Sequence, residues 1–350
     1  MKEQELIEEI RNVLEKAENP LFIIDDDPDG VCAYLLLKKY LKKGEFVLVK
    51  SAPIIGEEFL EHVHKKQPDV IIILDIANVS EEFLDGTRTP IVWIDHHEPK
   101  HPKNALYYNP RNYDDEAYVP TSECAWNIVQ DYDWIAAIGI MEDWKIPPFI
   151  DQLIKEYPDL IRKTENPGEL RFATEFGRVG MIIRASLKGQ DADCRTCIKL
   201  FENITSPYDF EKQPDKYMLP LKKYYDMKRE LDSLLEDANK NAEKTKDMII
   251  YGYRHVGVYA LTGILAEYLS YLNPDKLVLI GREKGGYYRM AIRAKRGDIN
   301  AALQRSFEGS AGRGGGHKLS CGGSIPASEF EDFIGKFKIE WKTQIEQLEN

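Results

Sequence analysis

Residues 21–30 read LFIIDDDPDG, and the class of the first part of the chain follows from this stretch. An apolar run of strand length passes directly into a group of four aspartates. The same plan returns at residues 70–75, which read VIIILD, and at residues 91–97, which read IVWIDHH. Helical spacing over residues 31–42 and 57–66 separates these runs. Alternating strands and helices predict an α/β domain with a parallel sheet and helices on both faces.

Acidic side chains stand at the end of each of these predicted strands, and ligands bind along the carboxyl edge of a parallel sheet. The acids are Asp25 with its neighbours, Asp75, and Asp95 followed by His96 and His97. Carboxylates that lie close together repel one another, and a divalent cation relieves the repulsion. Carboxylates with one or two imidazoles suit manganese, magnesium or zinc. A single such aspartate is often only a helix N-cap, but three converging groups indicate a metal site.

Three further residues belong to the same prediction. Gly30 is expected to let the backbone turn tightly beside the acids. For Asp26, direct ligation is weighed against solvent exposure or an indirect supporting role, and the sequence leaves both open. Residues 136–143 read AAIGIMED and predict a small apolar helix segment that delivers Asp143 near its end.

A long, charged, amphipathic segment over residues 219–246 predicts a helix that connects two domains. The predicted division is residues 1–215, a connecting helix over residues 216–246, and a smaller α/β domain over residues 247–350. The sequence RGGG at residues 313–316 is expected in a loop. The other predicted elements are helices at residues 2–17, 121–143, 149–163, much of 173–203, 259–272, 300–306 and 328–348, and strands at residues 46–49, 248–252, 276–280 and 287–293.

Charge is unevenly distributed along the 350 residues, whose formal net charge is −12. Residues 281–320 contain nine Lys or Arg and three acids, a local charge of +6, so the remainder carries −18. This basic segment favours a defined anionic ligand, with an ordinary solvated surface as the alternative. Consecutive glycines and nearby cations suit a phosphate, with a merely flexible loop as the alternative. The candidates are Arg293, Arg313, Gly314, Gly315, Gly316 and His317.

Composition also bears on the compartment. No apolar run approaches the roughly 18 residues of a membrane helix, and the acidic, amphipathic residues 1–18 do not resemble a signal peptide. The five cysteines are scattered and do not form a disulfide framework. Cys194 and Cys197 have C-x-x-C spacing without a second pair or a nearby histidine, and they are interpreted as packing thiols in a helix. We therefore expect a cytoplasmic protein.

Taken together, the motifs resemble those of the DHH–DHHA1 phosphoesterase superfamily. They are DxDxDG, a strand-end aspartate, Asp-His-His, a glycine-bearing segment ending in aspartate, and a C-terminal GGGH, and they occur in that order over residues 20–326. Within the superfamily the chain is most similar to the archaeal RecJ-like nucleases, nearer to the shorter, Hef-associated type than to the longer GINS-associated type. The resemblance implies a DHH domain joined by a long helix to a smaller DHHA1 domain.

The resemblance also implies roles for individual residues. Two Mn²⁺ ions, with Mg²⁺ as an alternative, would be held by Asp25, Asp27, Asp29, Asp75, His96 and Asp143. His97 would contact metal or the scissile phosphate, and Asp27 and Asp75 would be catalytic. Arg293, Arg313, Gly314, Gly315, Gly316 and His317 would bind the nucleic-acid backbone or a terminal nucleotide. Asp26 departs from the pattern, because relatives often carry His or Tyr there, and this puts the metal preference in question.

The function implied is a metal-dependent exonuclease of DNA repair or replication. It would hydrolyse single-stranded DNA, with RNA as a second substrate, to nucleoside monophosphates in the 3′→5′ direction. An oligoribonuclease or a cyclic-dinucleotide phosphodiesterase is the alternative, and a replisome scaffold without activity is the third. The implied partners are single-stranded nucleic acid and a Hef-like repair helicase or a replisome component; a homo-oligomer is left open. Aromatic residues that are expected in the core but could stack on bases are Tyr107, Tyr108, Tyr113, Trp144, Tyr287 and Tyr288.

Overall fold

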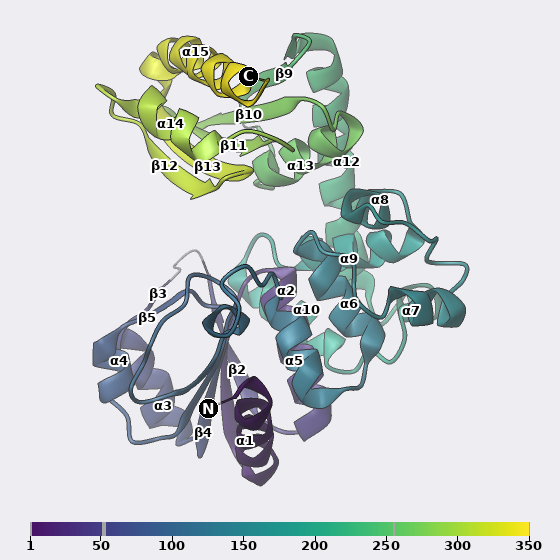
Figure 1. Ribbon diagram of the computed structural model, residues 1–350. Helices are drawn as coiled ribbons and strands as arrows, with labels where there is room; N and C mark the ends of the chain where they lie inside the picture. Colours follow the sequence, from purple (N-terminus) through teal and green to yellow (C-terminus); the bar gives the residue numbers. More distant parts are fainter. Residues whose placement is uncertain (1, 51–53, 255, 350) are drawn as a thin grey trace. The chain divides into compact units, whose positions relative to one another are not determined.

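The computed structural model describes residues 2–50, 54–254 and 256–349. The chain divides into two compact units, Met1–Tyr224 and Tyr225–Asn350 (Figure 1). Each unit is built on its own sheet with helices packed against it, so the predicted α/β class is confirmed. Within the described residues, no helix is both long enough and apolar enough to cross a membrane.

The first unit contains a five-stranded, all-parallel sheet in the order β2-β1-β4-β6-β7. Its strands are β1 (Pro20–Asp25), β2 (Glu45–Val49), β4 (Val70–Leu74), β6 (Ile91–Ile94) and β7 (Leu106–Tyr108). The three strands that end in acids, β1, β4 and β6, are neighbours at the centre of the sheet. The edge strand β7, of three residues, was not predicted, because so short a run carries no readable period.

Helices cover both faces of this sheet, as predicted. Apolar residues of α3 (Leu60–Lys66) and α4 (Glu81–Asp85) share one core with alternate residues of the strands. On the other face, α2 (Pro28–Leu41) contacts β1 and β4 and packs against two later helices, α5 and α6. The remaining elements are α1 (Glu3–Lys16), α5 (Thr121–Val129), α6 (Asp133–Glu142), α7 (Ile150–Glu156), α8 (Pro167–Phe172), α9 (Glu175–Ser186), α10 (Asp191–Phe201), α11 (Asp209–Lys212) and the strand pair β3 (Ile54–Ile55) and β5 (Asn78–Val79).

In the first unit, residues 121–143 and the segment with Cys194 and Cys197 were both predicted to be helical. The single helix expected over residues 121–143 is two helices, because Gln130 and Tyr132 take left-handed backbone angles, with φ of 55° and 59°, between α5 and α6. Cys194 and Cys197 lie in α10 as expected, and both are buried free thiols.

The second unit is a smaller domain whose six-stranded mixed sheet has the order β12-β13-β11-β10-β9-β8. Helices α14 and α15 share a core with one face of this sheet, and α13 contacts β10 and β11 (Figure 1). Helix α12 (Met218–Asn241) begins in the first unit and continues into the second. The other elements of the second unit are β8 (Glu243–Lys244), β9 (Met248–Arg254), α13 (Thr262–Leu272), β10 (Leu277–Lys284), β11 (Tyr287–Arg293), α14 (Ile299–Phe307), β12 (Arg313–His317), β13 (Ser320–Pro326) and α15 (Phe330–Glu349).

Two predictions for this part of the chain were wrong in detail. The long helix α12 ends at Asn241 rather than at residue 246, and the short strand β8 follows it. The expected glycine-rich loop is the edge strand β12, paired with β13. A Cβ on Gly314 would lie 2.3 Å from the Gly322 carbonyl oxygen, and one on Gly316 would lie 2.4 Å from that of Ser320. These two glycines therefore allow a close approach of two backbones, and they leave no side-chain pattern from which a strand could be predicted.

Candidate metal and phosphate site

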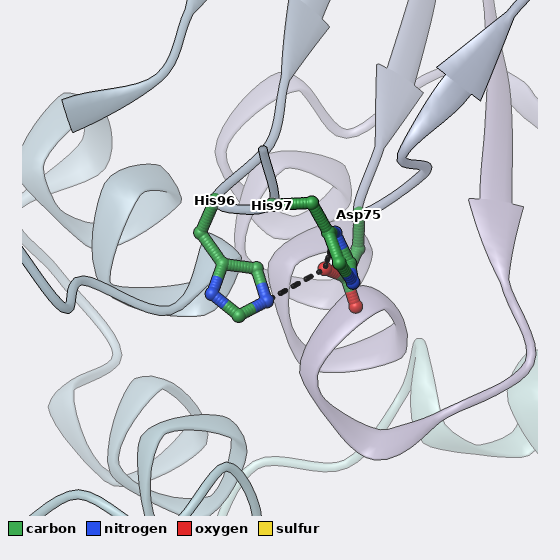
Figure 2. A group of neighbouring side chains, drawn as sticks. All are labelled: Asp75, His96 and His97. Atoms are coloured by element: carbon green, nitrogen blue, oxygen red, sulfur yellow. Dashed lines mark ion pairs between the residues drawn. The ribbon is translucent and has the colours of Figure 1, made fainter. Parts of the chain in front are cut away.

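The aspartates and histidines that end β1, β4 and β6 meet at one edge of the first sheet. Together with Asp143, which follows α6, these residues form three overlapping groups, each with its ligand atoms within 4.8 Å of one another. The groups are Asp75 with His96 and His97 (Figure 2), Asp29 with His96 and Asp143, and Asp25 with Asp27 and Asp75. All six predicted metal ligands and His97 are therefore brought together, and Asp75 and His96 each belong to two groups. That these groups bind metal stays a prediction.

The close packing of Asp25 and Asp75 depends on the start of α2. A Cβ on Gly30 would lie 3.1 Å from Asp75 Cβ and 3.3 Å from Asp25 Cβ, which is tighter than most real contacts. Gly30 is helical, so it is needed for this close approach and not for the tight turn that was expected. Asp27 caps the same helix, because its Oδ1 accepts a hydrogen bond of 2.9 Å from the Gly30 N–H. Residues 25–30 therefore both begin α2 and contribute aspartates to the site.

Asp29 is fixed by the N-terminus of α5. Its carboxylate accepts hydrogen bonds from the backbone N–H of Thr121 at 2.7 Å and of Ser122 at 3.0 Å, and from the Ser122 hydroxyl. The Thr121 hydroxyl donates to Asp75 Oδ1 at 2.9 Å. The amide groups at the start of a helix favour negative charge. The same helix end therefore holds two acids from different elements, Asp29 in the first turn of α2 and Asp75 directly after β4, and both belong to the ligand groups.

Asp143 and His96 come from opposite sides of the site. Asp143 follows directly on α6, as expected, and its Oδ2 lies 3.7 Å from His96 Nδ1. The other ring nitrogen of His96, Nε2, lies 3.5 Å from Asp75 Oδ1 (Figure 2). The hydroxyl of Tyr118 donates to Asp143 Oδ2 at 2.9 Å, and the tyrosine ring lies 6.1 Å from that of His96. The half-exposed Tyr118 thus borders the site, and it was not predicted.

His97 is oriented by Asp95, which is completely buried. Asp95 Oδ1 lies 2.7 Å from His97 Nδ1, and Asp95 Oδ2 accepts a hydrogen bond of 3.2 Å from the His97 backbone N–H. This pairing favours the proton on Nδ1 and turns Nε2 toward whatever the site holds. Burial alone would lower the pKa of His97, but the hydrogen bond to Asp95 and the surrounding carboxylates outweigh it, so the pKa is raised.

The carboxylates carry the electrostatic signature of a site that needs positive charge. Burial and the neighbouring Asp27 raise the pKa of Asp25 to about 7, and the same two causes raise the pKa of Asp29 to about 7. Burial and nearby aspartates also raise the pKa values of Asp75 and Asp143 well above the ordinary value. Bringing these acids together therefore costs free energy, and a bound cation would recover it.

Asp26 lies outside the three groups formed by the described residues. Burial raises the pKa of Asp26, while the charges of Lys188 and Lys50 oppose that shift. It therefore faces lysines as well as Asp27, which fits the supporting role that the sequence left open.

The donors fit Mn²⁺ or Mg²⁺. Carboxylate oxygens suit both ions, and imidazole nitrogen favours the softer Mn²⁺. Asp25, Asp27 and Asp75 would hold one ion, and Asp29, His96 and Asp143 a second; Asp75 and His96 also lie together in the third group, which links the two.

The predicted phosphate-binding residues gather in the sheet of the second unit. Arg293 is in register with Ser320 on β13, and Ser320 is in register with His317 on β12. Side chains at paired positions of antiparallel strands share a face, so these three residues form a row. Arg293 is held by Glu267, with an Nη2–Oε1 distance of 3.1 Å. Arg313 and His317 are exposed.

Comparison with known families decides the assignment. Residues 21–154 match the N-terminal domain of the DHH family, and residues 258–342 match the DHHA1 domain. The chain belongs to the DHH–DHHA1 superfamily. Members of this superfamily are metal-dependent phosphoesterases, so the chain is a hydrolase. The DHH match contains every residue of the three groups. The DHHA1 match contains the row of Arg293, Ser320 and His317, which is called the basic row below.

Solved structures share the fold of this DHH–DHHA1 chain at low sequence identity. The exonuclease RecJ bound to manganese is 17% identical, with a TM-score of 0.60, over 96% of this chain and 94% of that one. RecJ of Thermus thermophilus in complex with Mn²⁺ is 15% identical, with a TM-score of 0.64, over 97% of this chain and 54% of that one; it is also known with Mg²⁺. The pGpG-specific phosphodiesterase PggH of Vibrio cholerae is 12% identical, with a TM-score of 0.51, over 93% of this chain and 100% of that one. No curated protein matches the sequence.

Several DHH-domain residues were missed or were named without a role. Asp95 stands inside the quoted Asp-His-His motif, but its part in orienting His97 was not predicted. Thr121, Ser122 and Tyr118 lie far from the motifs in sequence, and no local spacing points to them. Of the aromatic candidates for base stacking, Tyr107 and Tyr108 are buried as expected, whereas Tyr287 is 51% exposed.

Proposed function

We propose that this DHH–DHHA1 protein is a metal-dependent exonuclease that shortens single-stranded DNA, and RNA as a second substrate, to nucleoside monophosphates. The observation that carries the proposal is the convergence of seven carboxylate and imidazole side chains in three overlapping groups, because a two-metal phosphodiesterase needs two neighbouring sets of ligands. Residues 1–215 are proposed as the catalytic part, residues 247–350 as the substrate-binding part, and residues 216–246 as the connection.

In the proposed reaction, two Mn²⁺ or Mg²⁺ ions would supply Lewis-acid activation of a water and neutralise charge on the scissile phosphate. The residues of the chain hold the parts in line. Asp75 belongs to one ligand group and His96 to the other, and the two residues are neighbours in the third group. His97, held by Asp95 at 2.7 Å and shifted toward its protonated form, presents Nε2–H to a phosphate oxygen. No side chain forms a covalent bond to the substrate.

The basic row would bind the phosphate backbone of the strand. Arginine suits phosphate because its planar donors can contact two oxygens at once. A Cβ on Gly315 would lie 3.6 Å from the side chains of Asn300 and Gln304, an ordinary van der Waals distance, so close backbone packing does not require this glycine as it requires Gly314 and Gly316. Such contacts are sensitive to salt and largely blind to base sequence, which suits an exonuclease.

The finer points of the proposal come from the resemblance. The direction proposed is 3′→5′, and the setting is DNA repair or replication, with a Hef-like helicase or a replisome component as partner. Binding of the first substrate phosphates by the DHHA1 domain would make a long strand a better substrate than a dinucleotide. An oligoribonuclease or cyclic-dinucleotide phosphodiesterase would show the reverse preference.

Digestion of single strands labelled at the 5′ or the 3′ end, in DNA and RNA form and with Mn²⁺, tests the proposal. The expected result is a ladder of shortening products with release of mononucleotide from the 3′ end. Hydrolysis confined to very short oligoribonucleotides or cyclic dinucleotides would favour the alternative function. If none of the substrates is hydrolysed, the proposed function is refuted.

A further inference from the structure

Asp143 is the only one of the predicted ligands that neither a strand end nor the first motif delivers. It caps the C-terminus of α6, beyond the last helical residue, Glu142. The next residue, Trp144, takes a left-handed backbone conformation with φ of 61°. A bulky residue in that region is uncommon and must be held by its surroundings. The position of Asp143 therefore depends on what fixes the residues on either side of it.

Both neighbours of Asp143 contact one side chain, that of Arg171 on α8. Its Nη2 lies 3.2 Å from Glu142 Oε2, and its guanidinium carbon lies 5.4 Å from the centre of the Trp144 ring. The guanidinium also lies 5.0 Å from the ring of Phe172. Arg171 is only 1% exposed and Glu142 only 4%. A buried charge persists only when it is paired, so these contacts hold Arg171 in one place.

The surroundings leave this arrangement little freedom. Glu142 has a second partner, Arg184 on α9, with Nε 2.5 Å from the same carboxylate oxygen. A Cβ on Gly177 would lie 2.0 Å from the Arg171 carbonyl oxygen, and one on Gly180 would lie 2.8 Å from Glu142 Oε1. Helix α9 thus packs directly against both partners of the ion pair, and at Gly177, where the neighbour is backbone, only glycine fits.

We propose that Arg171 is a positioning residue for the metal site, which holds Asp143 through both of its chain neighbours. Resting on the proposed metal-binding role of Asp143, the proposal assigns Arg171 no contact with metal or substrate. The guanidinium lies within ion-pair distance of Glu142 and within cation–π distance of Trp144 and Phe172 at the same time, which the compact ammonium of lysine cannot do. Residues that orient ligands in this way typically change metal affinity 10- to 100-fold when they are replaced.

The test compares Mn²⁺ binding by Arg171→Lys, Trp144→Leu and wild type, by calorimetric titration and electron paramagnetic resonance. Arg178→Lys is the matched control, because Arg178 on α9 is also ion-paired, to Glu175 and Glu211, but contacts neither neighbour of Asp143. We expect Arg171→Lys to lower the affinity for one of the two Mn²⁺ ions about tenfold and to leave the affinity for the other unchanged. Trp144→Leu keeps the ion pair between Arg171 and Glu142 and should lower the affinity for the same Mn²⁺ ion by a smaller factor.

Activity gives the second readout. Excess Mn²⁺ should restore turnover of Arg171→Lys, which a general loss of structure would not allow. Wild-type affinity for both ions in a folded Arg171→Lys protein, or equal weakening by Arg178→Lys, would overturn the proposal. If Arg171→Lys does not fold, Trp144→Leu decides in the same way. A wild-type protein that binds no Mn²⁺ would instead overturn the proposed function, and the role of Arg171 with it.

Discussion

Removing the metal should make the protein less stable as the pH rises toward neutrality. Folding raises the pKa of both Asp25 and Asp29 from 3.8 to about 7. Between these values the folded state binds protons that the unfolded state has released, so the free energy of unfolding falls as the pH increases. The loss is about 1.4 kcal/mol per pH unit for one such group. From pH 5 to pH 7 the loss is roughly 2 kcal/mol for one carboxyl, because the slope halves as the pH reaches the folded-state pKa, and at most about twice that for two that interact.

The assay is urea unfolding in EDTA and in Mn²⁺ at several pH values from 5 to 8. In EDTA the free energy of unfolding should fall by the amounts above, and in Mn²⁺ the fall should shrink or vanish. Asp75→Asn is the matched variant. Asparagine is well tolerated at the left-handed φ of 62° that Asp75 adopts, and its side-chain oxygen can still accept from the Thr121 hydroxyl.

Because Asp75→Asn removes one of several mutually repelling charges, it should be more stable than wild type in EDTA at pH 8. The gain in stability from Mn²⁺ should be largely lost in this variant. A flat or rising stability between pH 5 and pH 7 in EDTA would refute the reasoning. So would an Asp75→Asn protein that is less stable than wild type at pH 8 and is still stabilised by Mn²⁺.

Three further outcomes are expected. Arg313→Ala should weaken binding of single strands and lower the slope of log K against log salt by about 0.7. The control Arg305→Ala, which breaks an ion pair with Glu340, should leave the slope unchanged. Equal slopes for wild type and both variants in a fluorescence titration would contradict this. Asp95→Asn should lower the pKa of His97 and move the alkaline fall of the pH–rate profile to lower pH, and an unmoved profile would rule out a protonated His97. EDTA should abolish activity and Mn²⁺ should restore it better than Ca²⁺, which a metal-replacement assay measures directly.

The sequence predicted the acidic edge of the first sheet because the rule behind it is local. An apolar strand followed at once by an acid occurs three times, and parallel strands bring such ends together. Asp25, Asp75 and His96 could therefore be placed from their own neighbourhoods. Asp29 was included because it follows the first strand closely, whereas Asp143, at the end of a helix, was only weakly indicated until the resemblance was considered.

The parts that were missed depend on packing between distant segments. Arg171 meets Glu142 and Trp144 from another helix, and no period in the sequence connects them. Tyr118 reaches Asp143 from a loop. The strand β12 was predicted as a loop because its glycines have no side chains to alternate, and the break between α5 and α6 rests on left-handed backbone at Gln130 and Tyr132, which ordinary residues adopt without a clear sequence signal.

The central claim is that the converging acids and histidines bind metal and hydrolyse phosphodiester bonds. The most direct test is the release of mononucleotide from an end-labelled single strand in Mn²⁺, by wild type and by His96→Ala purified in parallel. His96 belongs to two of the three ligand groups, so its loss should abolish release while the thermal midpoint in EDTA stays near that of wild type. Release by a folded His96→Ala protein at the wild-type rate would contradict the account.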